Sequence, residues 1–501
     1  MLKLTGFPLP DVGILTLTAM AGKADPAAVT RDDLDAAADY LEKFYTKGIG
    51  KSLAAGVVFP NSGFVQAAFD KPELQYKRLA WANFVLRGHQ NLELGPILND
   101  LEKKEYRSMV LRGVQGAFCA FTGDPAYLRV SRDMLPMING RGIMNFSPMG
   151  EAGMPVSDVV LLAIHALPLG CVITQGALLA VESDDLALMF DFVKVNLETN
   201  RRFIHLANQN DYEKFPNLSS YKTRLMDVLV SSFLQGESKQ ETYRAPSLNA
   251  YHFSNNGTSA RIAIYALPSS TLQFVRTASQ GEYASAWRQI IQRGWIEEKP
   301  EAVELEEKAP KLTRRNFIYE DLFDLPEDAR RFLRTYFLRH PLQKFKRGDP
   351  RNDYSPFTET DLISWNLTAL FLKRILNMQE NRINQIRNLG DRLAQYIQER
   401  DDRRLLKDIY FERQYWRFRA VLLRAMYGYT GSEPLVTFDG YAQIFESFEE
   451  GQGAERADWN LARDLLLIRI FERLHAEGYW STVKETLQSE DAEEALKPVT
   501  E

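Results

Sequence analysis

Residues 383–397 read INQIRNLGDRLAQYI. Apolar residues stand at every third or fourth position, at Ile383, Ile386, Leu389, Leu393 and Ile397. This spacing places the apolar side chains on one face of an α-helix. The pattern starts soon after residue 360 and returns in residues 410–422 and 459–474. Because successive amphipathic helices bury their apolar faces against one another, the sequence predicts an all-α helical bundle over residues 359–501.

The first 296 residues mix helical and extended patterns. Thr30 or Asp32 can cap a helix whose apolar positions recur at three and four between residues 34 and 44. Runs of β-branched and aromatic residues predict strands, and apolar periodicity predicts two further helices. The strands are expected at residues 57–59, 172–181 and 262–265, and the helices at 185–200 and 221–235. Because strands and helices do not alternate regularly, we expect an α+β domain over residues 1–296.

Residues 297–358 are predicted to be a linker followed by a basic connector. Residues 297–311 are rich in Glu and Pro and lack apolar periodicity, which is typical of a solvated linker. Residues 330–351 set eight Lys or Arg among the aromatic residues Phe332, Tyr336, Phe337 and Phe345. This mixture suits a surface that neutralises phosphates and stacks bases, or a charged helix whose aromatic residues face the core.

Charge is unevenly distributed along the chain. The net charge of −5 argues against a lysine-coated surface for general nucleic-acid binding. Residues 378–424 nevertheless contain eleven Lys or Arg against seven Asp or Glu, a balance of +4. Residues 425–501 contain six against sixteen, a balance of −10. A local basic track is sufficient for a subunit of a larger assembly.

Seven basic residues between 392 and 424 fall within an arc of roughly 140° if the helix is continuous. One face of such a helix would track a phosphate backbone through counterion release, independently of base sequence. The alternative is a solvated face on which acidic neighbours pair with the arginines, namely Asp401, Asp402, Asp408 and Glu412. The candidates for contact with the DNA backbone are Arg392, Arg400, Arg403, Lys407, Arg413, Arg417 and Arg424 on this arc, and Arg339, Lys344, Lys346 and Arg347 in the connector.

Several classes of protein lack a signature in this sequence. Two cysteines in 501 residues, and an N-terminus without a cationic leader, indicate a reducing cytoplasm. No apolar run reaches about 18 residues, so no membrane span is expected. Residues 48–52 end like a phosphate-binding loop, but Tyr45 stands where its first glycine is required. The six histidines lack metal-binding spacing, and the sequence predicts a cytoplasmic protein that is not an enzyme and uses no cofactor.

Two short segments look like a zinc site that has lost most of its ligands. Residues 119–122 (CAFT) and 157–160 (SDVV) have the paired spacing of two CxxC turns, but only Cys119 is a thiol. Further motifs stand in order around them: residues 4–13 (LTGFPLPDVG), 51–53 (KSL), 59–64 (FPNSGF), 145–149 (NFSPM), 153–156 (GMPV), 166–171 (ALPLGC) and 251–257 (YHFSNNG). This arrangement, over roughly residues 1–270, resembles the CXXC-CXXC family of CRISPR-associated proteins, the large subunits of type I-B Cascade effector complexes.

The resemblance places Thr122, Ser157 and Val160 where the family has zinc ligands. One remaining thiolate does not hold zinc, so residues 106–171 are expected to form a degenerate zinc-knuckle region without metal.

The resemblance implies a non-catalytic subunit of an RNA-guided DNA-binding complex. Such a subunit recognises a short motif beside the target, promotes duplex opening and stabilises the displaced strand, while the guide RNA reads the target by base pairing. The implied partners are guide RNA, target DNA, the Cascade backbone subunits, and a helicase-nuclease or a transposition adaptor. The C-terminal part is similar to the Cascade small subunit, which can be made by internal initiation, and Met378 is the expected start.

Polar residues in turns are the candidates for reading the flanking motif. Asn and Gln amides bond adenine edges, Arg grips guanine, and Lys or Ser anchors phosphates. The candidates are Lys51, Asn61, Ser62, Arg141, Asn145, Asn208, Gln209, Asn210, Asn255 and Asn256. Asn in Pro- and Gly-rich segments equally serves to shape turns through its own side-chain hydrogen bonds.

A second class of function fits the same residues. The chain could be a helical scaffold or adaptor that binds only proteins, with its basic arc satisfied by its own acids or by an acidic partner. Salt dependence separates the two classes, because several phosphate contacts predict a steep loss of DNA affinity with added salt.

Overall fold

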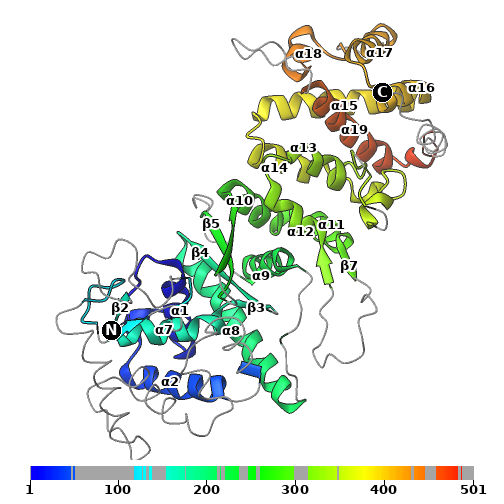
Figure 1. Ribbon diagram of the computed structural model, residues 1–501. Coiled ribbons are helices and arrows are strands. Elements are labelled where there is room, and N and C mark those ends of the chain that lie inside the picture. The colour runs from blue at the N-terminus through cyan, green and yellow to red at the C-terminus, as the bar shows by residue number, and fades with distance from the viewer. Residues whose placement is uncertain are drawn as a thin grey trace, which may run out of the picture. The chain divides into compact units, whose positions relative to one another are not determined.

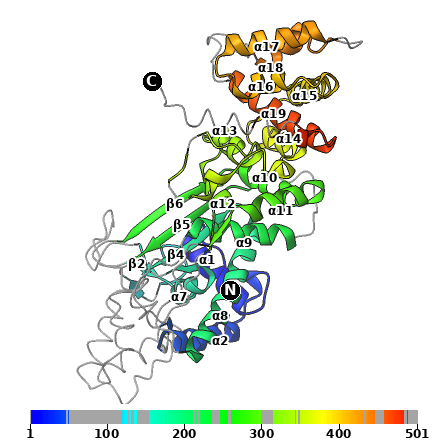
Figure 2. The ribbon, with the colours of Figure 1, turned by 90° about the vertical axis from the view of Figure 1, so that its right-hand side faces the viewer.

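The computed structural model describes residues 2–46, 49–50, 118–126, 128–130, 135–137, 154–174, 176–210, 215, 220–235, 246–255, 260–297, 314–342, 344–346, 349–429, 434–445, 458–482, 484 and 487. The chain forms two compact units. Unit 1 comprises Met1–Ser269 and Glu297–Arg315, and unit 2 comprises Ser270–Ile296 and Asn316–Glu501. Figure 1 and Figure 2 show the elements of each unit in two views.

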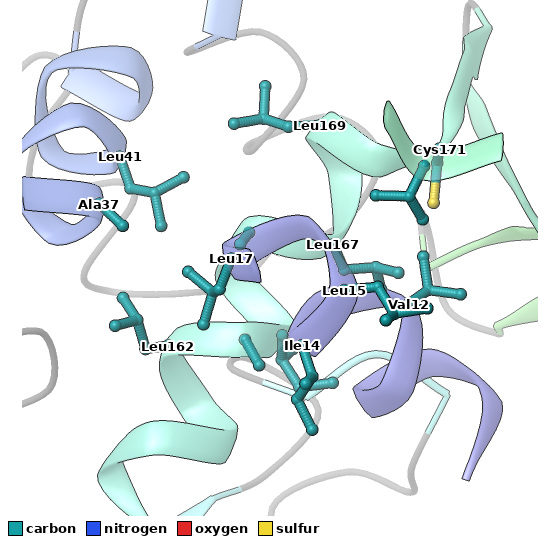
Figure 3. Close-up of a cluster of buried hydrophobic side chains, with 14 of the residues drawn as sticks. Val12, Ile14, Leu15, Leu17, Ala37, Leu41, Leu162, Leu167, Leu169 and Cys171 are labelled. Carbon is teal, nitrogen blue, oxygen red and sulfur yellow. The ribbon is translucent and has the colours of Figure 1, made fainter. Parts of the chain in front are cut away.

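Helices α1 (Pro8–Met20) and α7 (Asp158–Gly170) form the centre of unit 1. Both are apolar around most of their circumference, as expected for helices that neighbours surround. They approach closely at Gly13, where a β-carbon would stand 2.1 Å from the carbonyl oxygen of Ala163. Glycine is therefore required there for the two backbones to meet. Figure 3 shows the buried side chains that these helices contribute to the core, among them Val12, Leu15, Leu17, Leu162 and Leu167.

Two further helices pack around this centre, α2 (Arg31–Thr46) and α8 (Leu186–Gln209). Thr30 caps α2, because the N–H of Asp33 donates to Thr30 Oγ1 at 3.3 Å and the N–H of Thr30 donates to Asp33 Oδ2 at 2.9 Å. This reciprocal pair is a capping box, and it confirms Thr30 as the cap. Asp185 caps α8 by accepting the N–H of Ala187 at 2.9 Å.

An antiparallel four-stranded sheet in the order β3-β4-β5-β6 completes unit 1. The strands of unit 1 are β1 (Leu128–Val130), β2 (Met154–Val156), β3 (Val172–Thr174), β4 (Ala177–Ser183), β5 (Leu248–Ser254) and β6 (Arg261–Leu267). The register sets Tyr251 opposite both Ala180 and Ile264. Helix α9 (Tyr221–Gln235) packs on the sheet through Tyr221, whose ring stacks on His252 at 4.1 Å between centroids.

The described part of unit 2 is mainly helical. Its α-helices are α10 (Ser269–Ala278), α11 (Ala284–Arg293), α12 (Phe317–Asp321), α13 (Ala329–Phe332), α14 (Trp365–Arg374), α15 (Glu380–Arg400), α16 (Arg403–Phe411), α17 (Tyr415–Gly428), α18 (Phe438–Phe445) and α19 (Asp458–Ala476). Short 3₁₀ turns are η5 (Gly281–Tyr283), η6 (Leu322–Asp324), η8 (Pro350–Asp353) and η9 (Thr360–Leu362), and η7 (Leu333–Phe337) is a π-helical turn. Among the described residues of unit 1, Pro26–Ala28 form the 3₁₀ turn η1. Strands β7 (Trp295–Glu297) and β8 (Arg314–Asn316) pair with each other.

An aromatic cluster forms the core of the first half of unit 2. The ring of Phe371 lies 5.5 Å from that of Phe332, 5.2 Å from Phe337 and 5.4 Å from Phe274. All four residues are buried. Phe332 and Phe337 belong to the predicted basic connector, and like Tyr336 they pack inward. The alternative of a charged helix with aromatic residues in the core therefore holds for residues 329–337, whereas Phe345 is half-buried in a non-helical segment.

Helices α15, α16 and α17 are separate. Asp401 has a left-handed backbone with φ of 48° and ends α15. The side chain of Asp402 then accepts the N–H of Leu405 at 2.9 Å and begins α16. Glu412 has extended backbone angles and ends α16. The continuous helix on which the predicted basic arc depends does not exist. Its basic residues lie on α15, α16 and α17, except Arg413, which lies in the connection between α16 and α17.

The predicted fold class is confirmed, since an α+β part precedes a helical part. The division of the chain differs from the expected boundaries. Residues 270–296 belong to unit 2 instead of the N-terminal domain, and residues 316–358 supply part of the unit 2 core instead of a connector. In the part of the chain that the structure describes, no helix has the length and hydropathy needed to cross a membrane.

Acid is expected to destabilise unit 1 through His165. This residue is buried in α7 with Nδ1 2.7 Å from the carbonyl oxygen of Leu161, and burial lowers the pKa of His165 to about 4 against the opposing effect of that bond. An unfolded histidine has a pKa of about 6.5, so the unfolded chain binds the proton first and stability falls as pH drops from 6.5 towards 4. Between pH 7 and 4.5 we expect a loss of about 2–3 kcal/mol in unfolding free energy, measured by urea titration.

The pH test has an internal control. His165→Gln should flatten the pH dependence, whereas His205→Gln, at an exposed position of α8, should keep it. Equal slopes for the parent and His165→Gln would contradict the assignment.

Candidate nucleic-acid interface

Helix α17 exposes aromatic and apolar side chains on the face that does not pack. Trp416 is 65% exposed, Leu423 42% and Tyr427 91%. These positions are seven and four residues apart, so they lie along one side of the helix. The opposite side packs into unit 2 through Phe418, Val421, Leu422 and Ala425. We call Trp416, Arg417, Arg419, Leu423, Arg424 and Tyr427 the α17 face.

Arginines flank the aromatic residues of the α17 face. Residues 413–429 contain four arginines and no Asp or Glu. At about 100° per residue, Arg419 lies on one flank of the aromatic stripe and Arg417 and Arg424 lie on the other. The guanidinium carbon of Arg417 is 5.0 Å from the ring centroid of Trp416. Exposed rings beside cations form the combination that binds bases by stacking and phosphates by charge.

The connection before α17 fixes this face in place. The carboxylate of Glu412 accepts the N–H groups of Arg413 at 2.9 Å and Gln414 at 2.8 Å. Arg463 of α19 donates to the carbonyl oxygen of Glu412. Trp459 of α19 packs with its ring centroid 5.5 Å from that of Phe418, on the buried side of α17. The exposed rings therefore belong to a helix whose opposite side is fixed by contacts with α19. Figure 1 shows α17 packed against the other helices of its unit.

Comparisons with protein-family models, with curated proteins and with solved structures found no match to this chain. The chemistry of the α17 face therefore rests on its own residues. In the described part of the chain, no group of three or more His, Cys, Asp or Glu residues is arranged to hold a metal ion.

The predicted backbone contacts on α15–α17 have different roles. Arg392 donates to the carbonyl oxygen of Pro434 at 2.6 Å, which holds the segment before α18. Arg403 pairs with Asp401 at 2.9 Å, and Arg424 pairs with Asp408 at 3.2 Å. Exposed pairs of this kind are weak, so these arginines can exchange their carboxylate for a phosphate. Arg400, Arg413 and Arg417 are exposed, and Lys407 is half-buried.

In the connector, Arg339 is fully buried and its Nε donates to Glu359 Oε2 at 2.8 Å. Its guanidinium carbon also lies 3.7 Å from the ring centroid of Tyr354. An arginine enclosed in this way cannot reach a DNA backbone, so the prediction for Arg339 is wrong. Lys344 and Lys346 are exposed, and Arg347 lies outside the described residues.

The structure describes only some of the residues predicted to read the flanking motif. Lys51, Asn61, Ser62, Arg141, Asn145 and Asn256 lie outside the described residues. Asn208, Gln209 and Asn210 are exposed together at the C-terminal end of α8. Asn210 Nδ2 donates to the carbonyl oxygen of Leu206 at 2.8 Å, which is the turn-shaping role expected of Asn. Asn255 is fully buried, so its prediction as a base contact is wrong.

Sequence reasoning missed Trp416, Arg419 and Tyr427. The signal was present, because Trp416 and Tyr427 are eleven residues apart, close to three helical turns, in a segment without acidic residues. The predicted arc is defined by cations alone. Phe418 is buried in the core, whereas Trp416 and Tyr427 are exposed.

Cys119 lies in a tight turn near the start of α7, in the region predicted to be a degenerate zinc knuckle. The N–H of Gly123 donates to the carbonyl oxygen of Cys119 at 2.9 Å, and Gly123 has a φ of 70° that suits glycine. Ser157 caps α7 by accepting the N–H of Val160 at 3.4 Å. Burial would raise the pKa of the Cys119 thiol, but hydrogen bonds from the Thr122 hydroxyl and from the N–H of Ser157 outweigh it and lower the pKa. Residues 119, 122 and 157 therefore lie close together, and the interpretation of this region as a former zinc site stays a prediction.

Introducing the three thiols that the resemblance implies is expected to create a metal site. The triple variant Thr122→Cys, Ser157→Cys, Val160→Cys supplies four thiolates, one pair on a turn and one pair at a helix start, and should bind about one zinc ion per chain. The parent should bind none. Zinc is measured by mass spectrometry of the metal after dialysis against a weak chelator. Adding Cys119→Ser to the triple variant is the control and should weaken retention; stoichiometric zinc in the parent would contradict the loss of the site.

Proposed function

We propose that the chain is the non-catalytic large subunit of an RNA-guided DNA-binding complex of the type I-B Cascade kind. It recognises the motif beside the target, promotes duplex opening and stabilises the displaced strand. The observation that carries this proposal is the α17 face, which offers Trp416 and Tyr427 for stacking and arginines for phosphates. Such a face binds DNA independently of base sequence, because every base has a flat aromatic surface that can stack on a side-chain ring.

The chemistry of a displaced strand fits this face. When guide RNA pairs with one DNA strand, the other strand is left single, with its bases unstacked and its phosphates unneutralised. Aromatic side chains replace the lost stacking, and arginines release counterions from the backbone. Reading of the flanking motif would fall to unit 1, where the resembling motifs lie. The turn around Cys119 and the start of α7 support that resemblance.

The position of Met378 supports a separate small subunit. Met378 lies between α14 and α15, so a product that starts there would carry α15–α19 and the whole α17 face. The packing of α15 on α19 would remain, since both helices lie in the product. Guide RNA, target DNA, the backbone subunits and a helicase-nuclease or transposition adaptor complete the proposed assembly.

Purification of the tagged chain from its native host tests the assignment. RNA that co-purifies is sequenced, and the same sample is searched by mass spectrometry for a C-terminal fragment. Discrete RNAs with shared, repeat-derived ends would support the guide complex, and a fragment beginning near Met378 would support internal initiation. An intact, well-expressed sample without discrete RNA would overturn the proposal.

A protein-only scaffold is the second candidate. The ion pairs of Arg403 with Asp401 and of Arg424 with Asp408 favour it, because they neutralise part of the basic surface within the chain itself. The salt dependence of DNA binding by the assembled complex separates the two functions. Affinity that falls steeply with salt indicates phosphate contacts, and affinity at background level in low salt indicates a scaffold.

A further inference from the structure

Three arginines share one buried carboxylate in unit 2. Asp464, on α19, is fully buried. Its carboxylate lies 3.2 Å from Arg334 Nη1 and 3.2 Å from Arg463 Nη2, and Arg330 Nε lies 3.9 Å away. We call Arg330, Arg334 and Arg463 the arginine cluster.

The charges of the arginine cluster do not balance. Three guanidinium groups stand against one carboxylate, and none of the three contacts a second carboxylate in the part of the chain that the structure describes. Burial lowers the pKa of Arg463, and the charges of Arg334 and Arg330 lower it further against the opposing effect of Asp464. Like charges held at close range in a low-dielectric site repel, so a further anion would stabilise this arrangement.

A second group of arginines in the same bundle has its positive charges matched by carboxylates. Asp391 of α15 is approached by Arg469 at 2.7 Å, by Arg473 at 3.5 Å and by Arg387 at 4.0 Å. Arg469 also pairs with Glu472, and Arg473 also pairs with Glu477, so three carboxylates stand against three arginines. The arginine cluster lacks such second acids, which distinguishes it from an ordinary ion-pair network of this protein.

The arginine cluster also contains N–H donors that have no hydrogen-bond acceptor. Arg330 Nε and Arg463 Nε are buried and have no hydrogen-bond acceptor among the described residues, which is also true of Arg473 Nε in the Asp391 group. A buried donor without an acceptor is costly, so such groups normally meet a ligand or water. Guanidinium groups present their donors in a planar fork that matches the oxygens of a phosphate. A tetrahedral oxyanion would accept from more than one of these arginines at once.

The backbone holds the arginine cluster beside the start of α17. The π-turn η7 carries Arg334, whose Nε donates to the carbonyl oxygen of His340 at 3.3 Å. Arg463 donates to the carbonyl oxygen of Glu412, four residues before Trp416. The charge of Arg413 adds to those of Arg334 and Arg463 in lowering the pKa of His340, which burial lowers most, to about 3. His340 is therefore neutral near pH 7, and the positive charge here is entirely that of arginine.

We propose that the arginine cluster binds a phosphate group of the nucleic-acid strand whose bases stack on the α17 face. This inference rests on the proposed function. Arg330 is the ligand that solvent reaches, since 38% of its side chain is exposed against 12% for Arg334 and 8% for Arg463. Asp464 holds the two inner guanidinium groups in place, and the bound phosphate supplies the second negative charge.

Arg330→Ala and Arg331→Ala form a matched pair for testing this site in the full chain. Arg331 is the next residue of α13 and is equally exposed, but it pairs with Asp324 and with Asp328, each at 2.9 Å. The first probe is inorganic phosphate against chloride at equal ionic strength, with thermal unfolding as the readout. Phosphate should raise the Tm of the parent and of Arg331→Ala by about 2–4 °C and leave that of Arg330→Ala unchanged. Without phosphate, Arg330→Ala should be at least as stable as the parent because repulsion is relieved.

The second probe is a fluorescein-labelled oligothymidine strand titrated at several salt concentrations. Arg330→Ala should bind about tenfold more weakly and should reduce the slope of log affinity against log salt by about 0.7, whereas Arg331→Ala should match the parent. Equal phosphate shifts in parent and Arg330→Ala would overturn the site. Strand binding that depends on Trp416 but not on Arg330 would overturn the inference and leave the proposed function standing. A phosphate shift that depends on Arg330, without strand binding by any variant, would overturn the nucleic-acid source and leave a site for free phosphate.

Discussion

Replacing Trp416 and Tyr427 together by alanine is expected to weaken binding of single-stranded DNA at least about 30-fold. Each ring can stack one base, and a stacked base contributes about 1–3 kcal/mol. Both rings are more than half exposed and belong to a helix whose other face is buried, so their removal should leave the fold intact. Affinity for an oligothymidine strand, measured by fluorescence anisotropy, gives the effect directly.

Phe118 provides the control for the α17 face. It is 67% exposed, comparable with Trp416, and belongs to unit 1. Phe118→Ala should bind the strand as the parent does. The salt slope should remain unchanged in the double aromatic variant, because stacking neutralises no phosphate. Affinity equal to that of the parent would remove the α17 face from the interface.

Asp464→Asn is expected to lower the unfolding free energy of unit 2 by about 3–5 kcal/mol. The substitution keeps the shape of the side chain and removes the one carboxylate that three arginines share. Breaking a buried pair by removing one partner leaves uncompensated charge, which is among the most destabilising of single changes. Guanidinium chloride unfolding, followed by circular dichroism, measures the loss.

Two comparisons interpret the Asp464 result. Asp324→Asn removes a half-exposed carboxylate from Arg331 and should cost much less, because exposed ion pairs contribute little. Inorganic phosphate should recover part of the stability of Asp464→Asn, since its oxygens accept from the same guanidinium groups. A stability loss no larger than that of Asp324→Asn would show that the buried charges are compensated by another group.

Much of the fold follows from apolar spacing. Helices α9, α15 and α19 lie within a residue or a few of the predicted segments, and the strand expected at residues 262–265 is present. The run expected at residues 172–181 forms two antiparallel strands, β3 and β4, and the strand expected at residues 57–59 lies outside the described residues. Residues 330–351 show where spacing is insufficient. Alternating arginines and aromatic residues fit a surface as well as a core, and only the packing of Phe332 against Phe371 decides between them.

The candidate site was less predictable than the fold. The sequence indicates that residues 392–424 are basic, but not that Arg392 is used on backbone carbonyls or that Asp401 ends a helix. The two consecutive aspartates at 401 and 402 do indicate the helix break, since Asp is a favourable N-cap and Asp402 begins α16. Exposure of Trp416 depends on which face of α17 meets Trp459, a contact between segments more than forty residues apart.

The chain passes from one unit to the other three times, at residues 269–270, 296–297 and 315–316. A single protease cut between residues 297 and 315 would therefore not release unit 2, because the segment before it still joins the two units covalently. Exchange of unit 2 between genes, without residues 297–315 of unit 1, would likewise need breakpoints at all three crossings. The segment from Met378 onward is different, since it lies wholly within one unit and can be inherited, lost or copied as a continuous piece.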